Sequence, residues 1–386
     1  MRVLISGGGI AGNALAFCLS RLGHHVTVTE RFPSLRATGL QIDLRGHGID
    51  VLKRMGLEQA FRAKSVPEQG MQVVDGSGRR WAYFPANNTG QGTQSFTSEY
   101  EIMRGDFCQL LYDATEQHTE YLFGTYIESY RDEGDMIEVH FSDGSTDYFD
   151  LLVGADGQSS RTRRMMLGKN ASNAVFSIQN MLLAYFTAPR PIQPKEKYIA
   201  TMYMTSGGRG VMTRRHNSNN IQVYLGGKIG TETFAALTAG DVEKEKATFA
   251  EMFKNAGWIV PDIVKSLDDV DDFYLVGAYV LAGEIDAHCV WDENVAIGHK
   301  KECLTNALKA YEQKFRPFMD QVQKGAGEDD GKWDWVTSTS IGVFLQNCLM
   351  GVASLFKINI ADYMMKEMVK NWSLPDYHKL RWRAPS

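Results

Sequence analysis

Residues 2–30 read RVLISGGGIAGNALAFCLSRLGHHVTVTE, and this stretch predicts the first unit of the fold. The β-branched and aliphatic run 2–6 is typical of a strand buried on both faces. A glycine turn follows, and residues 11–22 carry apolar side chains at helical spacing. A second strand, 25–29, ends at the acidic residue Glu30. Strand, turn, helix and strand in this order predict an α/β protein with a parallel sheet.

The glycine turn has the spacing GxGxxG, formed by Gly7, Gly9 and Gly12. Gly7 permits the tight turn, Gly9 lets the backbone approach a pyrophosphate, and Gly12 lets helix and strand pack closely. The unpaired N–H groups at the helix N-terminus favour phosphate oxygens. Glu30 at the end of the second strand is placed to accept both hydroxyls of a ribose. The combination predicts a dinucleotide site, whereas the glycines alone would fit an ordinary turn.

Composition narrows the class of protein. The 386 residues are 44% hydrophobic and 23% charged, which is typical of a soluble globular protein and argues against disorder. With 41 basic and 46 acidic residues there is no basic surplus, so we expect no nucleic-acid partner. The five cysteines lack CxxC spacing, which predicts reduced thiols, a cytoplasmic location and no metal site.

Membrane signals are weak. The N-terminal apolar run breaks into glycines, which favours a buried strand over a signal peptide. The most apolar stretch, 341–356, is shorter than the roughly 20 residues of a spanning helix and contains Gln346 and Asn347. We therefore expect a docking or buried helix there and no membrane span.

Three further segments carry polar residues in a definite order. They are RATGLQIDLRGHG at 36–48, YEIMRGDFC at 100–108 and DLLVGADGQSSRTRR at 150–164. In the third, Asp156-Gly157 follows a buried strand, at the end where open α/β sheets bind ligands.

Together with the glycine turn, these segments resemble the class A FAD-dependent monooxygenases of the para-hydroxybenzoate hydroxylase type. The segment GLQIDLRGHGIDVLKRMGL is most similar to the branch that contains the tetracycline-inactivating monooxygenases. The resemblance implies that Arg104, which opens a helix, contacts FAD and that Asp156-Gly157 serves FAD and NAD(P)H. It also implies that Asp43 contacts FAD and that Arg36 acts on NADPH. The candidate cofactor-binding residues are Gly7, Gly9, Gly12, Glu30, Arg31, Arg36, Asp43, Arg104, Asp156 and Gly157.

Each of these residues has a plainer explanation. Arg104 could be a surface arginine of a helix, Asp156-Gly157 a common turn pair, and Asp43 and Arg36 residues that only order a loop. Their agreement in order along the chain favours the functional interpretation.

The resemblance implies a Rossmann-type FAD-binding domain interleaved with a mixed β-sheet substrate domain, plus C-terminal helices. We predict the major FAD-binding part at 1–172, the substrate domain at 173–275, an atypical remainder of the FAD-binding domain at 276–324 and C-terminal helices at 325–386. Alternating segments 181–187, 198–204 and 221–226 predict half-buried strands, and 240–256 predicts a helix. Candidate substrate-lining residues are Tyr203, Arg209, Met212 and Tyr224, although core packing explains each equally well.

The implied reaction is oxygen insertion into an aromatic or polycyclic phenolic substrate, including tetracycline-like compounds. NADPH or NADH would reduce FAD, and reduced FAD would react with O₂. This chemistry belongs to the cofactor, so we predict no catalytic protein nucleophile, and no hydrolase motif is present. We expect a monomer or weak dimer. One alternative is a flavin oxidase or dehydrogenase with the same motifs.

The sequence departs from the family after Tyr274. The family continues with a Gly-Asp strand end and a proline loop, which hold the flavin half of FAD, but residues 260–310 contain neither. One interpretation is that this segment is missing and 290–304 is a foreign insertion, as aberrant splicing would produce. The other treats 293–299 as a displaced strand with His299 in place of the aspartate. Both predict weak FAD binding and leave open an inactive, flavin-poor variant. A clear amphipathic helix resumes at 304–322, and 325–331 predicts a polar linker.

Overall fold

The structure, a computed structural model, describes residues 1–36, 39–87, 96–157, 160–168, 181–228, 242–263, 297–327, 338–356 and 372–381. One layer is a parallel sheet in the order β11-β1-β2-β7. Its strands are β1 (Arg2–Ser6), β2 (His25–Glu30), β7 (Thr119–Phe123) and β11 (Leu151–Gly154). Helix α1 (Ile10–Arg21) connects β1 to β2, which confirms the predicted strand–helix–strand unit.

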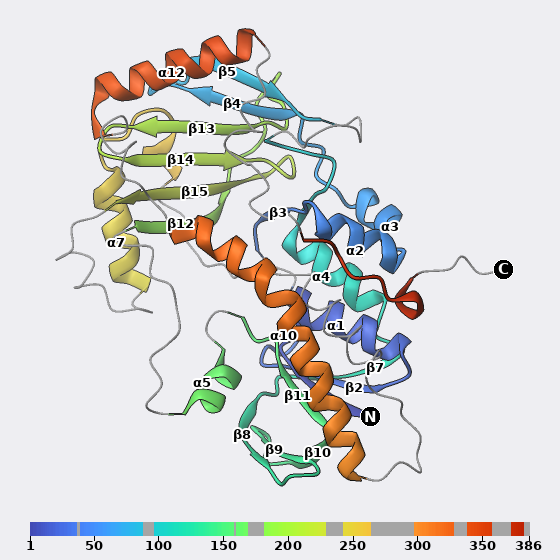
Figure 1. Cartoon of the computed structure of the whole chain (residues 1–386). Coiled ribbons are helices and arrows are strands. Elements are labelled where there is room, and N and C mark those ends of the chain that lie inside the picture. The colour runs from blue at the N-terminus through green and yellow to red at the C-terminus, as the bar shows by residue number, and fades with distance from the viewer. Residues whose placement is uncertain are drawn as a thin grey trace.

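Burial explains why this unit forms. Val3, Leu4 and Ile5 in β1 are fully buried, as a continuous apolar run in a central parallel strand requires. Helix α1 packs beside α4 (Arg104–Asp113), and α2 (His47–Met55) and α3 (Glu58–Ala63) share the same core (Figure 1). The helices thereby share one apolar core with β1 and β2.

Two small sheets extend this layer. Strands β3 (Gln41–Asp43) and β6 (Glu101–Met103) pair antiparallel, and β8 (Ile127–Asp132), β9 (Ile137–Phe141) and β10 (Thr146–Phe149) form a three-stranded antiparallel sheet. Helix α5 (Arg161–Leu167) follows β11 after a short turn. Of these pieces, Ile127 of β8 and Arg161 of α5 lie at the carboxyl ends of β1, β2 and β11.

The second layer is a six-stranded mixed sheet in the order β12-β15-β14-β13-β4-β5 (Figure 1). Its strands are β4 (Gly70–Val74), β5 (Arg80–Pro85), β12 (Met181–Pro189), β13 (Ala200–Thr205), β14 (Arg209–Arg214) and β15 (Asn220–Lys228). The three predicted strand segments correspond to β12, β13 and β15. Strands β4 and β5 of this sheet come from the segment 1–172, which was predicted as the major FAD-binding part, and the division into domains stays a prediction. Main-chain pairing of β4 with β13 across more than a hundred residues has no local sequence signal.

The two faces of this sheet have different neighbours. Helices α7 (Val242–Phe253) and α8 (Val260–Ile263) cover one face and share an apolar core with it. On the opposite face, Gln222 of β15 accepts a hydrogen bond from the backbone N–H of Gln41, at 2.9 Å. That face therefore meets the FAD-binding layer. Helix α12 (Ser340–Leu355) lies along β5, where Ser354 bonds to the backbone of Tyr83 (Figure 1).

Helix α10 (Ile297–Gly327) corrects two expectations about the C-terminal region. It begins seven residues before the predicted 304, so 297–299, with His299, are helical and not a displaced strand. It also includes Gly325–Gly327, the first residues of the predicted linker, although glycine disfavours a helix. The segment 264–296, which contains most of the departure from the family, lies outside the described residues. No helix in the described part of the chain is both long and apolar enough to cross a membrane.

Candidate active site

A pocket opens at the carboxyl ends of β1, β2 and β11. It brings together eight of the ten predicted cofactor-binding residues, which are Gly7, Gly9, Glu30, Arg31, Arg36, Arg104, Asp156 and Gly157. Gly12 lies beneath the turn, and Asp43 lies outside the pocket, paired with Arg45. The fold thus brings motifs that lie far apart in the sequence together at one pocket.

The glycine turn is tightly packed from below. Gly7 has φ +110°, and a Cβ there would lie 2.5 Å from the carbonyl oxygen of Ala155. A Cβ at Gly12 would lie 1.9 Å from the carbonyl oxygen of Gly7. The side chain of Asn13 donates to the carbonyl oxygen of Gly8 at 3.0 Å. The predicted roles of Gly7 in turning and of Gly12 in close packing are consistent with this geometry.

The side of the glycine turn that faces the pocket is open. Among the described residues beyond its own helix and chain neighbours, a Cβ at Gly9 would meet one atom within 4 Å, Nη2 of Arg104 at 3.6 Å. Gly9 is the N-cap of α1, without a side-chain cap and without an acidic residue in the first turn. The N–H groups and positive dipole end of α1 therefore face the pocket together with Arg104. This cradle, which a side chain at Gly9 would fill, fits an anionic pyrophosphate such as that of FAD.

Glu30 stands at the rim of the pocket. Its Oε2 accepts from the backbone N–H of Gly8 at 3.0 Å, and its Oε1 accepts from the N–H of Phe32 at 3.1 Å. Both bonds orient the carboxylate at the end of β2. Each carboxylate oxygen keeps further acceptor capacity, which a ribose hydroxyl could use.

Asp156 has a structural task in this geometry. Its Oδ2 accepts from the N–H and the hydroxyl of Thr162, each at 3.0 Å, and its Oδ1 accepts from Ser160. The carboxylate thus ties β11 to the start of α5. Gly157 has φ +78°, a conformation that favours glycine. Contacts of this turn with a cofactor would come from its backbone.

Sequence reasoning missed one cation of the pocket, Arg161. It is the first residue of α5 and lines the pocket, with its guanidinium 4.2 Å from the ring centroid of Tyr126. The signal was present, since a basic run directly follows Asp156-Gly157 in the sequence. A basic residue at that place is suited to a phosphate or to the nicotinamide cofactor.

Asp43 does not line the pocket. It is paired with Arg45 and accepts from the hydroxyl of Ser98 at 3.0 Å. Burial raises the pKa of Asp43, and Arg45 and Arg214 oppose that rise. The predicted contact of Asp43 with FAD stays a prediction, and the loop-ordering alternative accounts for the bonds seen.

A buried cluster of charged side chains joins the two layers. It was not predicted from the sequence. The side chains of Glu68 and Glu101 are 0% exposed and that of Arg214 is 10% exposed. Arg214 bonds to Glu68 at 2.6 Å and also contacts Glu101. Gln41 donates to Glu101, and the backbone N–H of Ser98 does so at 3.2 Å. Burial raises the pKa of Glu101 to about 8, with Glu68 and Asp43 adding to the rise and Arg214 opposing it.

The four candidate substrate residues fall on opposite faces of the six-stranded sheet. Met212 pairs with Tyr224 in register, on the face that also carries Gln222 and meets the FAD-binding layer. Tyr203 pairs with Val211 inside the core under α7. Arg209 points to the same side and donates to the backbone of Met252. The four residues therefore lie two on each face, because side chains alternate across a strand, and a substrate role for any of them stays a prediction.

Comparison with known proteins agrees with this site. A family model described as "FAD binding domain" matches residues 1–244. The chain is also 43% identical to FAD-dependent monooxygenase asL4 of Sarocladium schorii, over 98% of this chain and 99% of the relative. The chain belongs to the FAD-dependent monooxygenase family. The predicted family and the α/β fold are thereby confirmed.

Other members and structures support the assignment. Flavin-dependent monooxygenase eupH of a Phoma species is 36% identical over 92% of each chain. The crystal structure of tetracycline destructase Tet(51) has the same fold, with a TM-score of 0.67 at 22% identity over 97% of this monooxygenase chain and 99% of that one. The alignment with asL4 runs over 427 positions, more than the 386 residues here, so asL4 carries residues without a counterpart in this chain.

Proposed function

We propose that this monooxygenase binds FAD at the glycine-turn pocket and uses NAD(P)H and O₂ to hydroxylate an aromatic or polycyclic phenolic substrate. The observation that carries the proposal is the convergence of the open turn at Gly9, the α1 N-terminus, Glu30 and Arg104 on one pocket. Bound FAD would supply the redox and oxygen chemistry, and the protein would bind, orient and exclude water.

The residues of the pocket would have different tasks. The backbone N–H groups at Gly9 and the guanidinium of Arg104 would hold the pyrophosphate, and Glu30 would hold the ribose. Arg36 and Arg161, at the rim, would hold phosphates of NAD(P)H. Met212 and Tyr224, on the sheet face toward the FAD-binding layer, would line the substrate chamber. Tet(51), which shares this fold, is a tetracycline destructase, and a polycyclic substrate is therefore included in the proposal.

We further propose that FAD is held weakly and that turnover is slow. The family's Gly-Asp and proline-loop segment does not occur between 260 and 310, and asL4 has residues that this chain lacks. Without that segment only the adenine half of FAD has a binding site of the family type. Misplacing a reacting group by about 1 Å can cost on the order of a hundredfold in rate.

Purification in the presence and absence of added FAD tests the proposal. We expect little flavin absorbance in the protein as isolated, saturable FAD binding on titration, and slow NADH or NADPH oxidation that a phenolic substrate stimulates. Flavin binding without oxygen insertion would favour another flavin oxidoreductase. No binding at any FAD concentration would favour an inactive member of the family. We also propose that the protein is cytoplasmic and that it is a monomer or a weak dimer. Light scattering would measure its mass in solution.

A further inference from the structure

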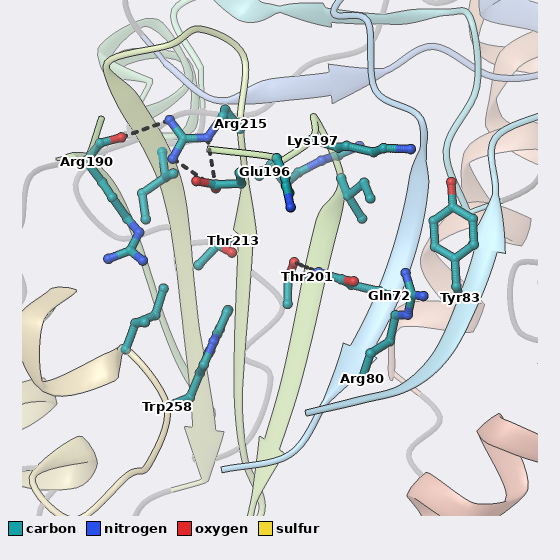
Figure 2. Close-up of a pocket in the computed structure, with 15 residues that line it drawn as sticks. Gln72, Arg80, Tyr83, Arg190, Glu196, Lys197, Thr201, Thr213, Arg215 and Trp258 are labelled. Atoms are coloured by element: carbon teal, nitrogen blue, oxygen red, sulfur yellow. Dashed lines mark hydrogen bonds and ion pairs between the residues drawn. The ribbon is translucent and has the colours of Figure 1, made fainter. Parts of the chain in front are cut away.

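A second cavity lies on the other face of the six-stranded sheet, away from the FAD-binding layer (Figure 2). Its volume is about 440 Å³, within the range of sites for small organic ligands. Thr201 and Thr213, which pair across β13 and β14, form its floor. They lie on the face opposite Gln222, because side chains alternate along each strand. The sheet therefore separates this cavity from the flavin side.

Cations dominate the lining. Arg80, Arg190, Lys195 and Lys197 are there, and none of them has an acidic partner among the described residues. Figure 2 shows Arg80, Arg190 and Lys197 on different sides of the space. Four positive charges around one cavity favour an anion.

The one acidic residue of the lining is already paired with an arginine. Glu196 Oε1 accepts from Arg215 at 3.1 and 3.2 Å, and its Oε2 accepts from the backbone N–H of Gln193 at 2.8 Å. Arg215 is 2% exposed and also donates to the carbonyl oxygen of Arg190 at 2.8 Å. This pair fixes the segment that carries Arg190, Lys195 and Lys197, and it leaves their charge uncompensated.

Two residues with unfavourable backbone conformations line the same cavity. Among the described residues, the two non-glycine residues with positive φ are Lys195, at 68°, and Trp258, at 56°, and both line this cavity. Such conformations cost roughly 1–3 kcal/mol and cluster at ligand sites. Trp258 also offers the cavity an aromatic face, which an aromatic ligand can contact.

We propose that this cavity is a second binding site, for a small aromatic carboxylate. The positive charge of the lining, to which Arg190 and Lys197 contribute from different sides, holds the carboxylate, the indole of Trp258 contacts the ring, and the threonine hydroxyls bond to polar substituents. The site takes no part in oxygen insertion, since the sheet lies between it and the flavin side. The proposal does not depend on FAD binding, so the two can fail separately.

The test uses 1-naphthoate as probe and calorimetry on the full chain, with and without saturating FAD. We expect saturable binding that added FAD does not displace and that weakens at least tenfold for the uncharged isostere 1-naphthamide. The double variant R190Q/K197Q should weaken naphthoate binding at least tenfold, whereas K309Q, a change at an exposed lysine of α10, should leave it unchanged.

Four results would overturn the proposal. The first three are equal affinity for naphthoate and naphthamide, unchanged affinity in R190Q/K197Q, and displacement of naphthoate by FAD. Inorganic phosphate binding as tightly as naphthoate would show an anion site without a role for the ring, against the proposed ligand class. Because W258F changes a residue with positive φ, its folding is checked by thermal unfolding. Where W258F folds, it should weaken naphthoate more than phosphate.

Discussion

Glu30 at the end of β2 accepts a hydrogen bond on Oε2 from the backbone N–H of Gly8, with 3.0 Å between the atoms. The bond ties the acid of the second strand to the glycine turn after the first strand. One side chain therefore orders the turn and presents a carboxylate to the pocket. The two functions can be separated by mutation.

Glu30→Ala should weaken FAD binding by about 1–3 kcal/mol, because a charged hydrogen-bond acceptor is lost. Glu30→Gln retains an acceptor for the Gly8 N–H and should lose less. Titration with FAD, followed by flavin fluorescence, measures both. Glu128→Ala, at an exposed position on β8, is the control. An unchanged FAD dissociation constant in Glu30→Ala would remove this residue from the cofactor site.

Two glycines of one motif should respond differently to substitution. Gly9→Val places its side chain in the open cradle, so it should abolish FAD binding while the protein remains folded. Gly12→Ala forces a Cβ against the carbonyl oxygen of Gly7 and should lower the free energy of unfolding by about 1–3 kcal/mol or more. Thermal unfolding and FAD titration of both variants separate the effects. A folded Gly9→Val that binds FAD normally would place the pyrophosphate elsewhere.

Arg36 and Arg104 both line the pocket and should differ in the cofactor they serve. Arg36→Ala is expected to raise KM for NAD(P)H with flavin content unchanged, since its guanidinium lies 5.2 Å from the ring centroid of Phe32, a residue that is 36% exposed. Arg104→Ala is expected to lower flavin content, since Arg104 lies over the glycine turn. Steady-state kinetics and flavin absorbance give the two readouts. The opposite pattern would mean that the two roles are exchanged.

Features set by neighbouring residues could be predicted from the sequence. The strand run 2–6, the glycines and Glu30 belong to one short stretch of chain, and the geometry of the turn depends on short-range sterics. Residues such as Arg104 and Asp156 could be placed because each marks a strand end or a helix start. Arg161 could have been found in the same way.

Features that depend on long-range pairing could not be predicted. Tyr203 and Met212 both occur in alternating segments, and only the register of β13 with β14 assigns them to opposite faces. Glu68, Glu101 and Arg214 come from three distant segments, so their contact had no sequence signal. The helical start of α10 at Ile297 was missed, and one of the two interpretations of this segment treated 293–299 as a displaced strand.

Glu101 should make stability depend on pH. Its pKa is about 8 in the folded chain against an ordinary 4.5, chiefly because of burial, so the folded state holds a proton that the unfolded state has lost. The free energy of unfolding should therefore fall as pH rises between these values. Glu101→Gln should remove this fall and be more stable than the original chain above pH 8. Urea unfolding across this pH range, with Glu128→Gln as control, measures it. If the free energy of unfolding of Glu101→Gln falls with pH as steeply as that of the original chain, the prediction is wrong.

The departure after Tyr274 should determine how firmly FAD is held. In this family the glycine turn holds the adenine half of FAD, and the Gly-Asp and proline-loop segment holds the flavin half. Each contact worth roughly 1.4 kcal/mol changes the dissociation constant tenfold, so losing a few charge-assisted bonds turns retained FAD into exchangeable FAD.

Inserting a Gly-Asp and proline-loop segment between Tyr274 and Leu275 should therefore raise both flavin occupancy and turnover. Removing all of 290–304, which the sequence alone favoured, would cut the first residues from α10, where Cys303 and Leu304 pack against the core. The better design ends the deletion before Ile297. Flavin absorbance and NAD(P)H-dependent hydroxylation compare the original chain, the insertion, and an insertion of equal length made of glycine and serine. If the original chain already purifies yellow with one FAD per chain and oxidises a phenol efficiently, another part of this chain must supply the flavin half of the site.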